Sequence, residues 1–291
     1  MGFSKLQDIL NACEKKSVPF WKAVLLKDVK ERYVSEEASF EKMRGMYHAM
    51  RTADNEYDGN LMSASGLAGG DGAKLENYRV GQQKLVGDFL STVMEKAIKM
   101  GESNACMKRI VAAPTAGSCG VIPAVLLSYE EYNDVTEDKM VEALFVAAGI
   151  GEVIATTASI SGAEGGCQAE IGSASAMAAG AICYLEGGNN EEIVHAAALA
   201  LKNTLGLTCD PVAGLVEVPC IKRNASAAVN SVVACQLTLA GVRSAIVPDE
   251  VIDSMRRIGK LIPGCLRETS QEGLAITPSA QAVVQKLSKR K

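Results

Sequence analysis

The sequence predicts an all-α or nearly all-α protein, and three observations support that fold class. Apolar side chains recur at helical spacing through much of the chain. Convincing alternation of apolar and polar residues, the pattern of a half-buried strand, is missing, and the best candidate is the short run 110–113 before Pro114. Aromatic residues make up only 4% of the chain while alanine and glycine abound, and small side chains let helices pack closely.

The first fifty residues are predicted to form three short helices. Apolar side chains keep helical spacing over 6–13 and 21–29. Ser35 is a favourable N-cap, and Glu36 and Glu37 place negative charge in the first turn of the third helix. That helix carries four apolar residues at helical spacing, namely Phe40, Met43, Tyr47 and Met50.

Three later helices have recognisable boundaries, and the pattern places them at 85–98, 189–205 and 249–261. The first has a continuous apolar stripe, and Gly101 is expected to stop it. The second starts at Asn189 or Asn190, has two glutamates in its first turn and has a glycine past its end. Pro263 is expected to terminate the third.

The chain shows no low-complexity linker, internal repeat or second core. We therefore expect one main domain over residues 61–280, a helical segment of residues 1–60 packed on it, and a basic tail of residues 281–291. The net charge of −4 and the isoelectric point near 5.5 argue against nucleic acid or an anionic membrane as the main partner.

Cysteine usage and hydropathy point to a cytoplasmic protein. Nine cysteines in a chain of 291 residues are too few for a disulfide scaffold, and we find no signal peptide. The most apolar stretch, 171–185, is shorter than the roughly 20 residues that a membrane span needs. We therefore expect reduced thiols and no membrane partner.

Three cysteines stand where cysteines rarely occur by chance. Cys167 follows a glycine pair, Cys209 precedes Asp-Pro, and Cys220 ends a Val-Pro-Cys run. Glycine and proline indicate irregular backbone, on which a thiol can face a ligand instead of packed neighbours. A closed zinc site needs four ligands, whereas three thiols suit an iron–sulfur cluster with one iron left open. The spacing matches no local signature, so this pattern alone makes the cluster one plausible interpretation.

Two glycine-rich loops, 63–74 and 114–123, each lead into a predicted helix. Free N–H groups in such a loop, together with a helix N-terminus, form an anion site. A flexible surface turn is an equally good interpretation of the first loop, and a P-loop is excluded because Gly-Lys-[Ser/Thr] is missing. Together the loops suit one small-carboxylate pocket, and these residues are its candidates: Ser63, Ser65, Gly66, Gly69, Asp71, Thr115, Gly117 and Ser118.

The remaining cysteines and the two histidines fit structural roles at least as well. Three cysteines fall in apolar helical patterns, where a buried small side chain is expected, namely Cys13, Cys183 and Cys235. Cys119 lies inside the second glycine loop, and its role stays open. His195 is surrounded by alanine and leucine, which favours a core position. His48 precedes the first glycine loop on a helix, where a surface position is as good an interpretation as a functional one.

At this point the chain resembles the iron–sulfur-dependent L-serine dehydratases, and more closely the separate α subunit of the two-chain form. The resemblance runs from about residue 63 to 278 and rests on five long motifs. These are SGLAGGDG (65–72), APTAGSCGVIPA (113–124), GAEGGCQAEIG (162–172), CDPVAGLVEVPC (209–220) and LRETSQEGLA (266–275).

The resemblance implies a helical catalytic domain that deaminates L-serine to pyruvate and ammonia. It places a [4Fe–4S] cluster on Cys167, Cys209 and Cys220. The family's proposed base lies in a Ser-x-His-Thr motif of the β region, and single-chain relatives end in a cysteine; this chain has neither feature. We therefore expect the base to come from a β subunit, in a heterodimer or higher hetero-oligomer. Within this chain the fallback catalytic residues are Lys74, Thr115 and His48.

The expected chemistry follows from the substrate, because hydroxide is a poor leaving group and the α proton of serine is weakly acidic. An iron without a cysteine ligand would act as a Lewis acid on the hydroxyl, and the loops would hold the carboxylate. Three alternatives stay open. They are L-cysteine desulfidation by a related cluster enzyme, an iron–sulfur redox or sensor protein, and a structural subunit whose cysteines are all core residues.

Overall fold

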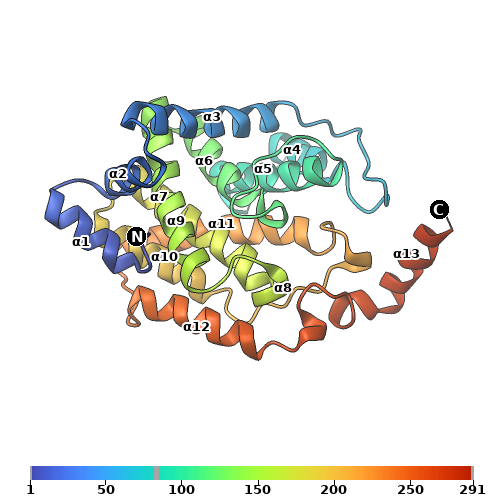
Figure 1. The fold of residues 1–291 in the computed structure, drawn as a ribbon. Coiled ribbons are helices and arrows are strands. Elements are labelled where there is room, and N and C mark those ends of the chain that lie inside the picture. The colour runs from blue at the N-terminus through green and yellow to red at the C-terminus, as the bar shows by residue number, and fades with distance from the viewer. Residues whose placement is uncertain (1, 82–84, 290–291) are drawn as a thin grey trace.

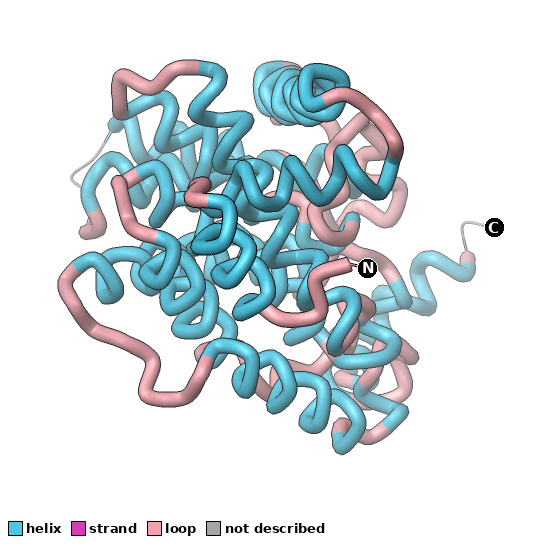
Figure 2. Tube along the Cα trace, turned by 60° about the vertical axis from the view of Figure 1, so that its left-hand side comes forward, coloured by secondary structure: helices cyan, strands magenta, loops and turns pink. Residues whose placement is uncertain are grey.

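The computed structural model describes residues 2–81 and 85–289. Figure 2 shows helices and loops in this part of the chain, so the predicted all-α class is confirmed. Thirteen α-helices lie within the described residues: α1 (Leu6–Lys16), α2 (Phe20–Arg32), α3 (Glu36–Asn55), α4 (Asp71–Gly81), α5 (Gly87–Ala105), α6 (Val121–Tyr132), α7 (Glu137–Thr157), α8 (Gly162–Gly165), α9 (Ser173–Leu185), α10 (Asn190–Lys202), α11 (Cys220–Leu239), α12 (Pro248–Leu261) and α13 (Pro278–Ser288).

Several loops contain one short turn of a helix type other than the α-helix. A π-helical turn follows Cys167, and four 3₁₀ turns lie in loops near the ends of the longer helices. The π turn is Gln168–Gly172, and the 3₁₀ turns are Ala116–Ser118, Val212–Gly214, Gly264–Leu266 and Gly273–Ile276. Single π turns inserted beside α-helices are common at functional sites.

Two of the predicted helix starts are confirmed by their capping bonds. The hydroxyl of Ser35 accepts the N–H of Ala38 at 3.0 Å and begins α3. The side chain of Asn189 accepts the N–H of Glu192 at 3.0 Å, and the Glu192 carboxylate accepts the N–H of Asn189 at 2.9 Å. These bonds satisfy N–H groups that a helix start leaves without partners.

Two other local predictions were wrong. Gly101 does not end α5, which continues to Ala105. This glycine serves helix packing instead, because a Cβ at residue 101 would stand 3.1 Å from the side chain of Ile221. α10 ends at Lys202, before the predicted end. The run 110–113, the best strand candidate in the sequence, pairs with no other segment among the described residues, which agrees with the predicted all-α class.

Helix α9 lies at the centre of the molecule, and α6, α7, α10 and α11 pack around it (Figure 1). Its residues 173–183 are all buried. The close approach depends on missing side chains. A Cβ at Gly180 of α9 would stand 2.2 Å from Cδ1 of Ile150, and one at Gly151 would stand 2.7 Å from Cε of Met177. The glycines and alanines therefore serve the interior of the bundle.

Helices α1, α2 and α3 share one continuous hydrophobic core with the rest of the bundle. Helix α7 is long and apolar enough to cross a membrane, but two thirds of that window (67%) is buried in the core, as expected of a central helix in a folded domain. Helix α13 covers much of the predicted basic tail and extends away from the body in Figure 1. Residues 290 and 291 of that tail lie outside the described residues.

Candidate functional site

The fold brings the three singled-out cysteines together from distant segments. Cys167 joins α8 to the π turn, Cys209 lies in the loop after α10, and Cys220 begins α11. Their residues are only 2%, 3% and 7% exposed, and all three thiols are free. They lie near one another: besides burial, the thiols of Cys167 and Cys220 both contribute to raising the pKa of Cys209, and the thiol of Cys167 contributes to raising the pKa of Cys220.

Burial dominates the acidity of these thiols. It raises the pKa of Cys167 to about 11 and that of Cys220 to about 12, and it raises the pKa of Cys209 as well. The guanidinium of Arg223 opposes this rise at Cys167. In the part of the chain that the structure describes, no three His, Cys, Asp or Glu side chains are placed to hold a single metal ion. An iron–sulfur cluster takes one thiolate per iron and therefore needs a wider arrangement.

Gly162 is closely surrounded by side chains from three other parts of this site. A Cβ at this position would stand 2.9 Å from Oε2 of Glu170, 3.0 Å from Sγ of Cys209 and 3.2 Å from Oε2 of Glu268. Two carboxylates and one cysteine therefore pack closely around residue 162, and only a glycine fits there without displacing one of them.

Glu170 connects the cysteines to the second glycine loop. Its carboxylate oxygens lie 3.3 and 3.4 Å from the position that a Cβ of Gly117 would take, so Gly117 and Gly162 both bring their backbone close to it. Desolvation raises the pKa of Glu170, and a hydrogen bond from Thr115 opposes that rise. No lysine or arginine among the described residues forms an ion pair with this carboxylate. A largely buried carboxylate of this kind favours a cationic ligand.

The second glycine loop keeps donors available. The hydroxyl oxygens of Thr115 and Ser118 lie 3.1 Å apart and form a hydrogen bond. The N–H groups of Ala116 and Gly117 make no hydrogen bond within the described residues. Asn224 of α11 fixes the loop, since its amide donates to the carbonyl of Gly117 at 2.8 Å. The same amide reaches the carbonyl of Cys220 at 2.9 Å.

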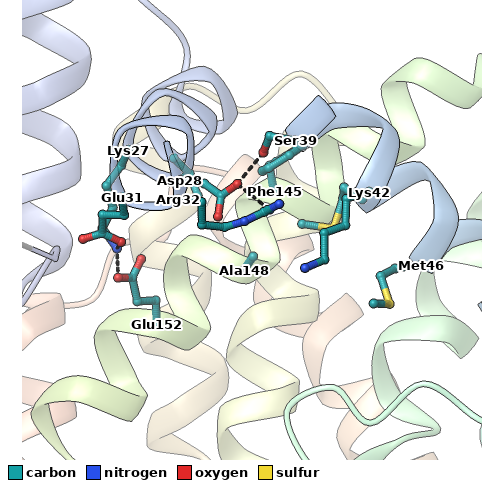
Figure 3. A pocket seen from close by; sticks show the side chains of 12 residues that line it. Lys27, Asp28, Glu31, Arg32, Ser39, Lys42, Met46, Phe145, Ala148 and Glu152 are labelled. Atoms are coloured by element: carbon teal, nitrogen blue, oxygen red, sulfur yellow. Dashed lines mark hydrogen bonds and ion pairs between the residues drawn. The ribbon is translucent and has the colours of Figure 1, made fainter. Parts of the chain in front are cut away.

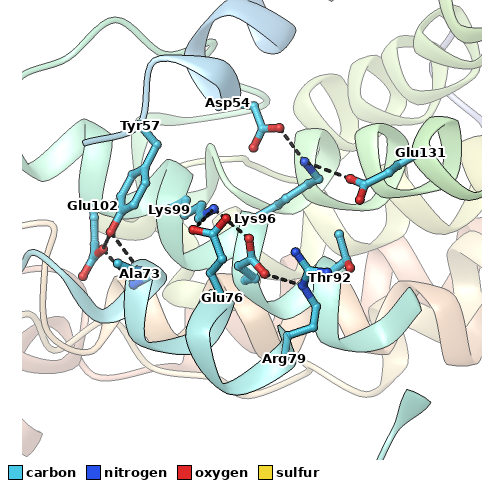
Figure 4. Close-up of polar contacts among 12 residues, drawn as sticks. Asp54, Tyr57, Ala73, Glu76, Arg79, Thr92, Lys96, Lys99, Glu102 and Glu131 are labelled. Carbon is cyan, nitrogen blue, oxygen red and sulfur yellow. Dashed lines mark hydrogen bonds and ion pairs between the residues drawn. The ribbon is translucent and has the colours of Figure 1, made fainter. Parts of the chain in front are cut away.

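The first glycine loop is differently placed, because the chain's own carboxylates already use its donors. The buried carboxylate of Glu102 accepts the N–H groups of Gly69, Asp71 and Gly72 at 3.2, 2.8 and 3.0 Å. Tyr57 donates to the same carboxylate at 2.6 Å (Figure 4). The N–H groups at this helix start therefore bind a carboxylate of the chain itself, that of Glu102.

The two serines of this loop bind a second carboxylate. Ser63 and Ser65 donate to Oε2 of Glu217 at 3.0 and 2.5 Å. Asp71 accepts from Lys74 at 2.8 Å and from Lys222 at 2.7 Å. Gly66 and Gly69 supply positive backbone φ angles of 77° and 137°, which turn the loop.

The fallback bases lie in unfavourable places for proton abstraction near the cysteines. The side chain of Lys74 is 78% exposed, and its hydrogen bond to Asp71 raises its pKa. His48 contacts Glu137 at the first turn of α7, at 3.1 Å. The cysteine segment begins beyond the other end of that helix, which is about 30 Å long at 1.5 Å per residue.

The last sequence motif, 266–275, clamps the Cys209 loop. The N–H of Cys209 donates to the carbonyl of Leu266 at 2.9 Å, and the N–H of Glu268 donates back to the carbonyl of Cys209 at 2.7 Å. Asp210 accepts the N–H of Leu274 at 2.8 Å and the guanidinium of Arg223 at 3.1 Å. These bonds hold Cys209 on backbone that belongs to no helix.

Sequence reasoning missed five residues of this site: Glu170, Glu217, Arg223, Asn224 and Glu268. Three of them stand inside motifs that carried the resemblance, and the other two follow Cys220 by three and four residues. In these motifs only the cysteines and the glycine-rich loops had drawn attention. Asn224 offered the best local signal, since an asparagine four residues after Cys220 lies one turn further along the same helix face.

Cys119 and a cavity of the N-terminal half are separate from the site of the three thiols. Cys119 is fully buried against Met100, as a core residue would be. A cavity of about 440 Å³ opens between α2, α3 and α7 (Figure 3). Its charged side chains mostly pair with each other, as Lys27 does with Glu152.

Free buried thiols, glycines that pack closely on Glu170 and open N–H donors define a helical protein whose candidate site is built around cysteines. A family model described as "Serine dehydratase alpha chain" matches residues 15–275. The chain therefore belongs to the serine dehydratase alpha chain family, whose named members are lyases.

Two similar alpha chains match this chain over nearly its whole length, and a longer relative matches it over 62%. The chain is 42% identical to the probable L-serine dehydratase alpha chain of Bacillus subtilis (strain 168), over 98% of this chain and 95% of that one. It is 37% identical to the L-serine dehydratase alpha chain of Peptoniphilus asaccharolyticus, over 95% of each. It is 46% identical to the L-serine dehydratase TdcG of Escherichia coli (strain K12), but this match covers only 40% of that longer protein.

Proposed function

We propose that this chain is the cluster-binding half of an L-serine dehydratase of the two-chain type. The observation that carries the proposal is the convergence of Cys167, Cys209 and Cys220 from three distant segments onto one buried place. The relatives named as L-serine dehydratase alpha chains support the reaction and imply a beta chain. A cytoplasmic location would suit such an enzyme and its reduced thiols.

The residues present fit a [4Fe–4S] cluster. Three buried thiols without disulfide partners are a donor set that iron prefers. When bound, the cluster would supply a Lewis acid for the hydroxyl of the substrate.

The chain's own residues would orient the substrate. The ammonium group of L-serine suits the carboxylate of Glu170, which has no cationic partner in the described residues. The carboxylate of L-serine suits the free N–H groups of Ala116 and Gly117, with Thr115 and Ser118 beside them. Held at both ends, the substrate would present its α proton in one fixed direction.

The base is proposed to come from the partner chain. A general base must reach the α proton directly or through one water. Lys74 is exposed and paired, and His48 lies at the far end of α7, so neither is well placed. A split active site that opens onto the subunit interface accounts for both positions.

Anaerobic iron and sulfide analysis tests the proposal. We expect close to four of each per chain and a broad visible absorption that air bleaches. Replacing Cys167, Cys209 or Cys220 by serine should abolish both signals, whereas Cys183→Ser, which alters a buried core thiol, should leave them. Retention of the cluster in Cys209→Ser would contradict the assignment.

The reaction itself is tested by following pyruvate. The loaded chain with its beta chain should form pyruvate and ammonia from L-serine. Sulfide release from L-cysteine, at a higher kcat/KM than that for L-serine, would favour the desulfidase alternative. A cluster that changes redox state without forming pyruvate would favour a redox protein.

A further inference from the structure

The first glycine loop holds the turn that carries Cys220 from its N-terminal side. Ser63 and Ser65 both donate to Oε2 of Glu217, which stands three residues before Cys220. The three side chains belong to buried residues, and the two hydroxyls also lie 3.0 Å from each other. The bonds therefore form one small buried polar network between the loop and the cysteine segment.

The same loop also contacts the segment beyond Cys220. Lys222 donates to Oδ2 of Asp71 at 2.7 Å. Ile221 packs with Ala68 of the loop in a small buried hydrophobic cluster. Residues before and after Cys220 are thus attached to one short stretch of chain, and Cys220 lies between the attachment points.

The loop is itself fixed to the body of the protein. Glu102 of α5 accepts three of its N–H groups, and Tyr57 completes the coordination of that carboxylate (Figure 4). Because these donors are already satisfied, binding a substrate carboxylate here would require Glu102 or Glu217 to give up bonds inside the protein.

We propose that residues 63–72 are a positioning element for Cys220 and do not contact the substrate. Glu217, Ile221 and Lys222 are the three points through which the loop sets the direction of the Cys220 thiol. This inference rests on the proposed function, because the direction of that thiol matters only if the cysteines bind a cluster. It assigns the substrate carboxylate to the second glycine loop alone.

The double variant Ser63→Ala/Ser65→Ala tests the proposal in the loaded enzyme with its beta chain. Its matched control is Ser128→Ala, which removes a fully buried hydroxyl that has no hydrogen-bond partner among the described residues. We expect the double variant to hold less iron and sulfide per chain and to bleach several-fold faster in air than the control. The KM for L-serine of the fraction that stays loaded should be unchanged.

Two results would overturn the inference. An increased KM at full cluster content would show that the hydroxyls bind substrate, as the glycine pattern alone predicts. Unchanged bleaching and unchanged KM would show that the loop serves only the fold. A wild-type chain that binds no iron would refute the proposed function itself, and this result is seen before any variant is made.

Lys222→Met decides the question if the double variant does not fold. The side chain of Lys222 is 52% exposed, so its loss should leave the circular dichroism spectrum and the thermal midpoint close to those of wild type. Faster bleaching than in Lys42→Met, which replaces an exposed lysine of α3, would support the positioning role. Equal bleaching rates in the two variants would contradict it.

Discussion

Glu170 shows how much a single residue gains from its neighbours. In the sequence it is one of 34 acidic residues, three positions after Cys167. In the structure it lies between two glycines, beside Thr115, with no basic partner in the described residues. Its proposed role in binding the substrate ammonium follows from this combination of burial and missing countercharge.

Glu170→Gln should weaken the use of L-serine without removing the cluster. Glutamine keeps the shape but loses the charge, and a hydrogen bond to a charged group contributes about 1.5–3 kcal/mol. We therefore expect KM to rise roughly 10- to 100-fold, while iron content and visible absorption stay at wild-type values. Glu164→Gln, an exposed carboxylate on α8, is the control. An unchanged KM would show that the ammonium binds elsewhere.

Gly162→Ala should damage the site more than its size suggests. The new methyl group would meet Glu170, Cys209 and Glu268 at 3.2 Å or less, so at least one of them must move. Gly264→Ala, in a nearby turn where a Cβ meets only an arginine tip at 3.9 Å, is the control. We expect a large loss of bound iron in the first variant and normal iron in the second. Normal iron content in Gly162→Ala would mean that the immediate surroundings of Gly162 are not part of the cluster site.

At the scale of elements, the central packing of α9 on α7 depends on glycine. Gly180→Ala would place a methyl group 2.2 Å from Cδ1 of Ile150, and overpacking of this kind costs roughly 1–3 kcal/mol. Gly45→Ala in α3, where no atom lies within 4 Å of the new Cβ, should be neutral or slightly stabilising. Urea unfolding of both variants measures the difference. Equal stability would show that α7 and α9 can separate without loss.

At the scale of the whole molecule, we expect the chain to need a second polypeptide for turnover. The isolated chain should bind its cluster but form pyruvate slowly, and added beta chain should raise the rate until the two are in a fixed ratio. Titration of a constant amount of this chain with beta chain measures that ratio. Full turnover by the isolated chain would refute the split site, and loss of that turnover in Lys74→Ala or His48→Ala would then identify the base.

The sequence by itself determined the helical class and several helix starts, and it singled out the three cysteines as candidate cluster ligands. These features are local: helical spacing, a capping serine or asparagine, and thiols flanked by glycine or proline can all be recognised within a few neighbouring residues. The asparagine cap at Asn189 is confirmed because its two bonds join residues only three apart. The resemblance to the dehydratases is carried by equally local motifs.

Tertiary structure alone decided which donors are free. The two glycine loops look alike in sequence, but Glu102 accepts three N–H groups and Glu217 two hydroxyls of the first, whereas no carboxylate accepts the N–H groups of Ala116 and Gly117 within the described residues. Glu102 lies about thirty residues from the loop it serves, and Glu217 about one hundred and fifty. Whether a polar group is already bonded depends on such distant partners. No local pattern could therefore have distinguished the proposed positioning element, residues 63–72, from the proposed substrate site in the second glycine loop.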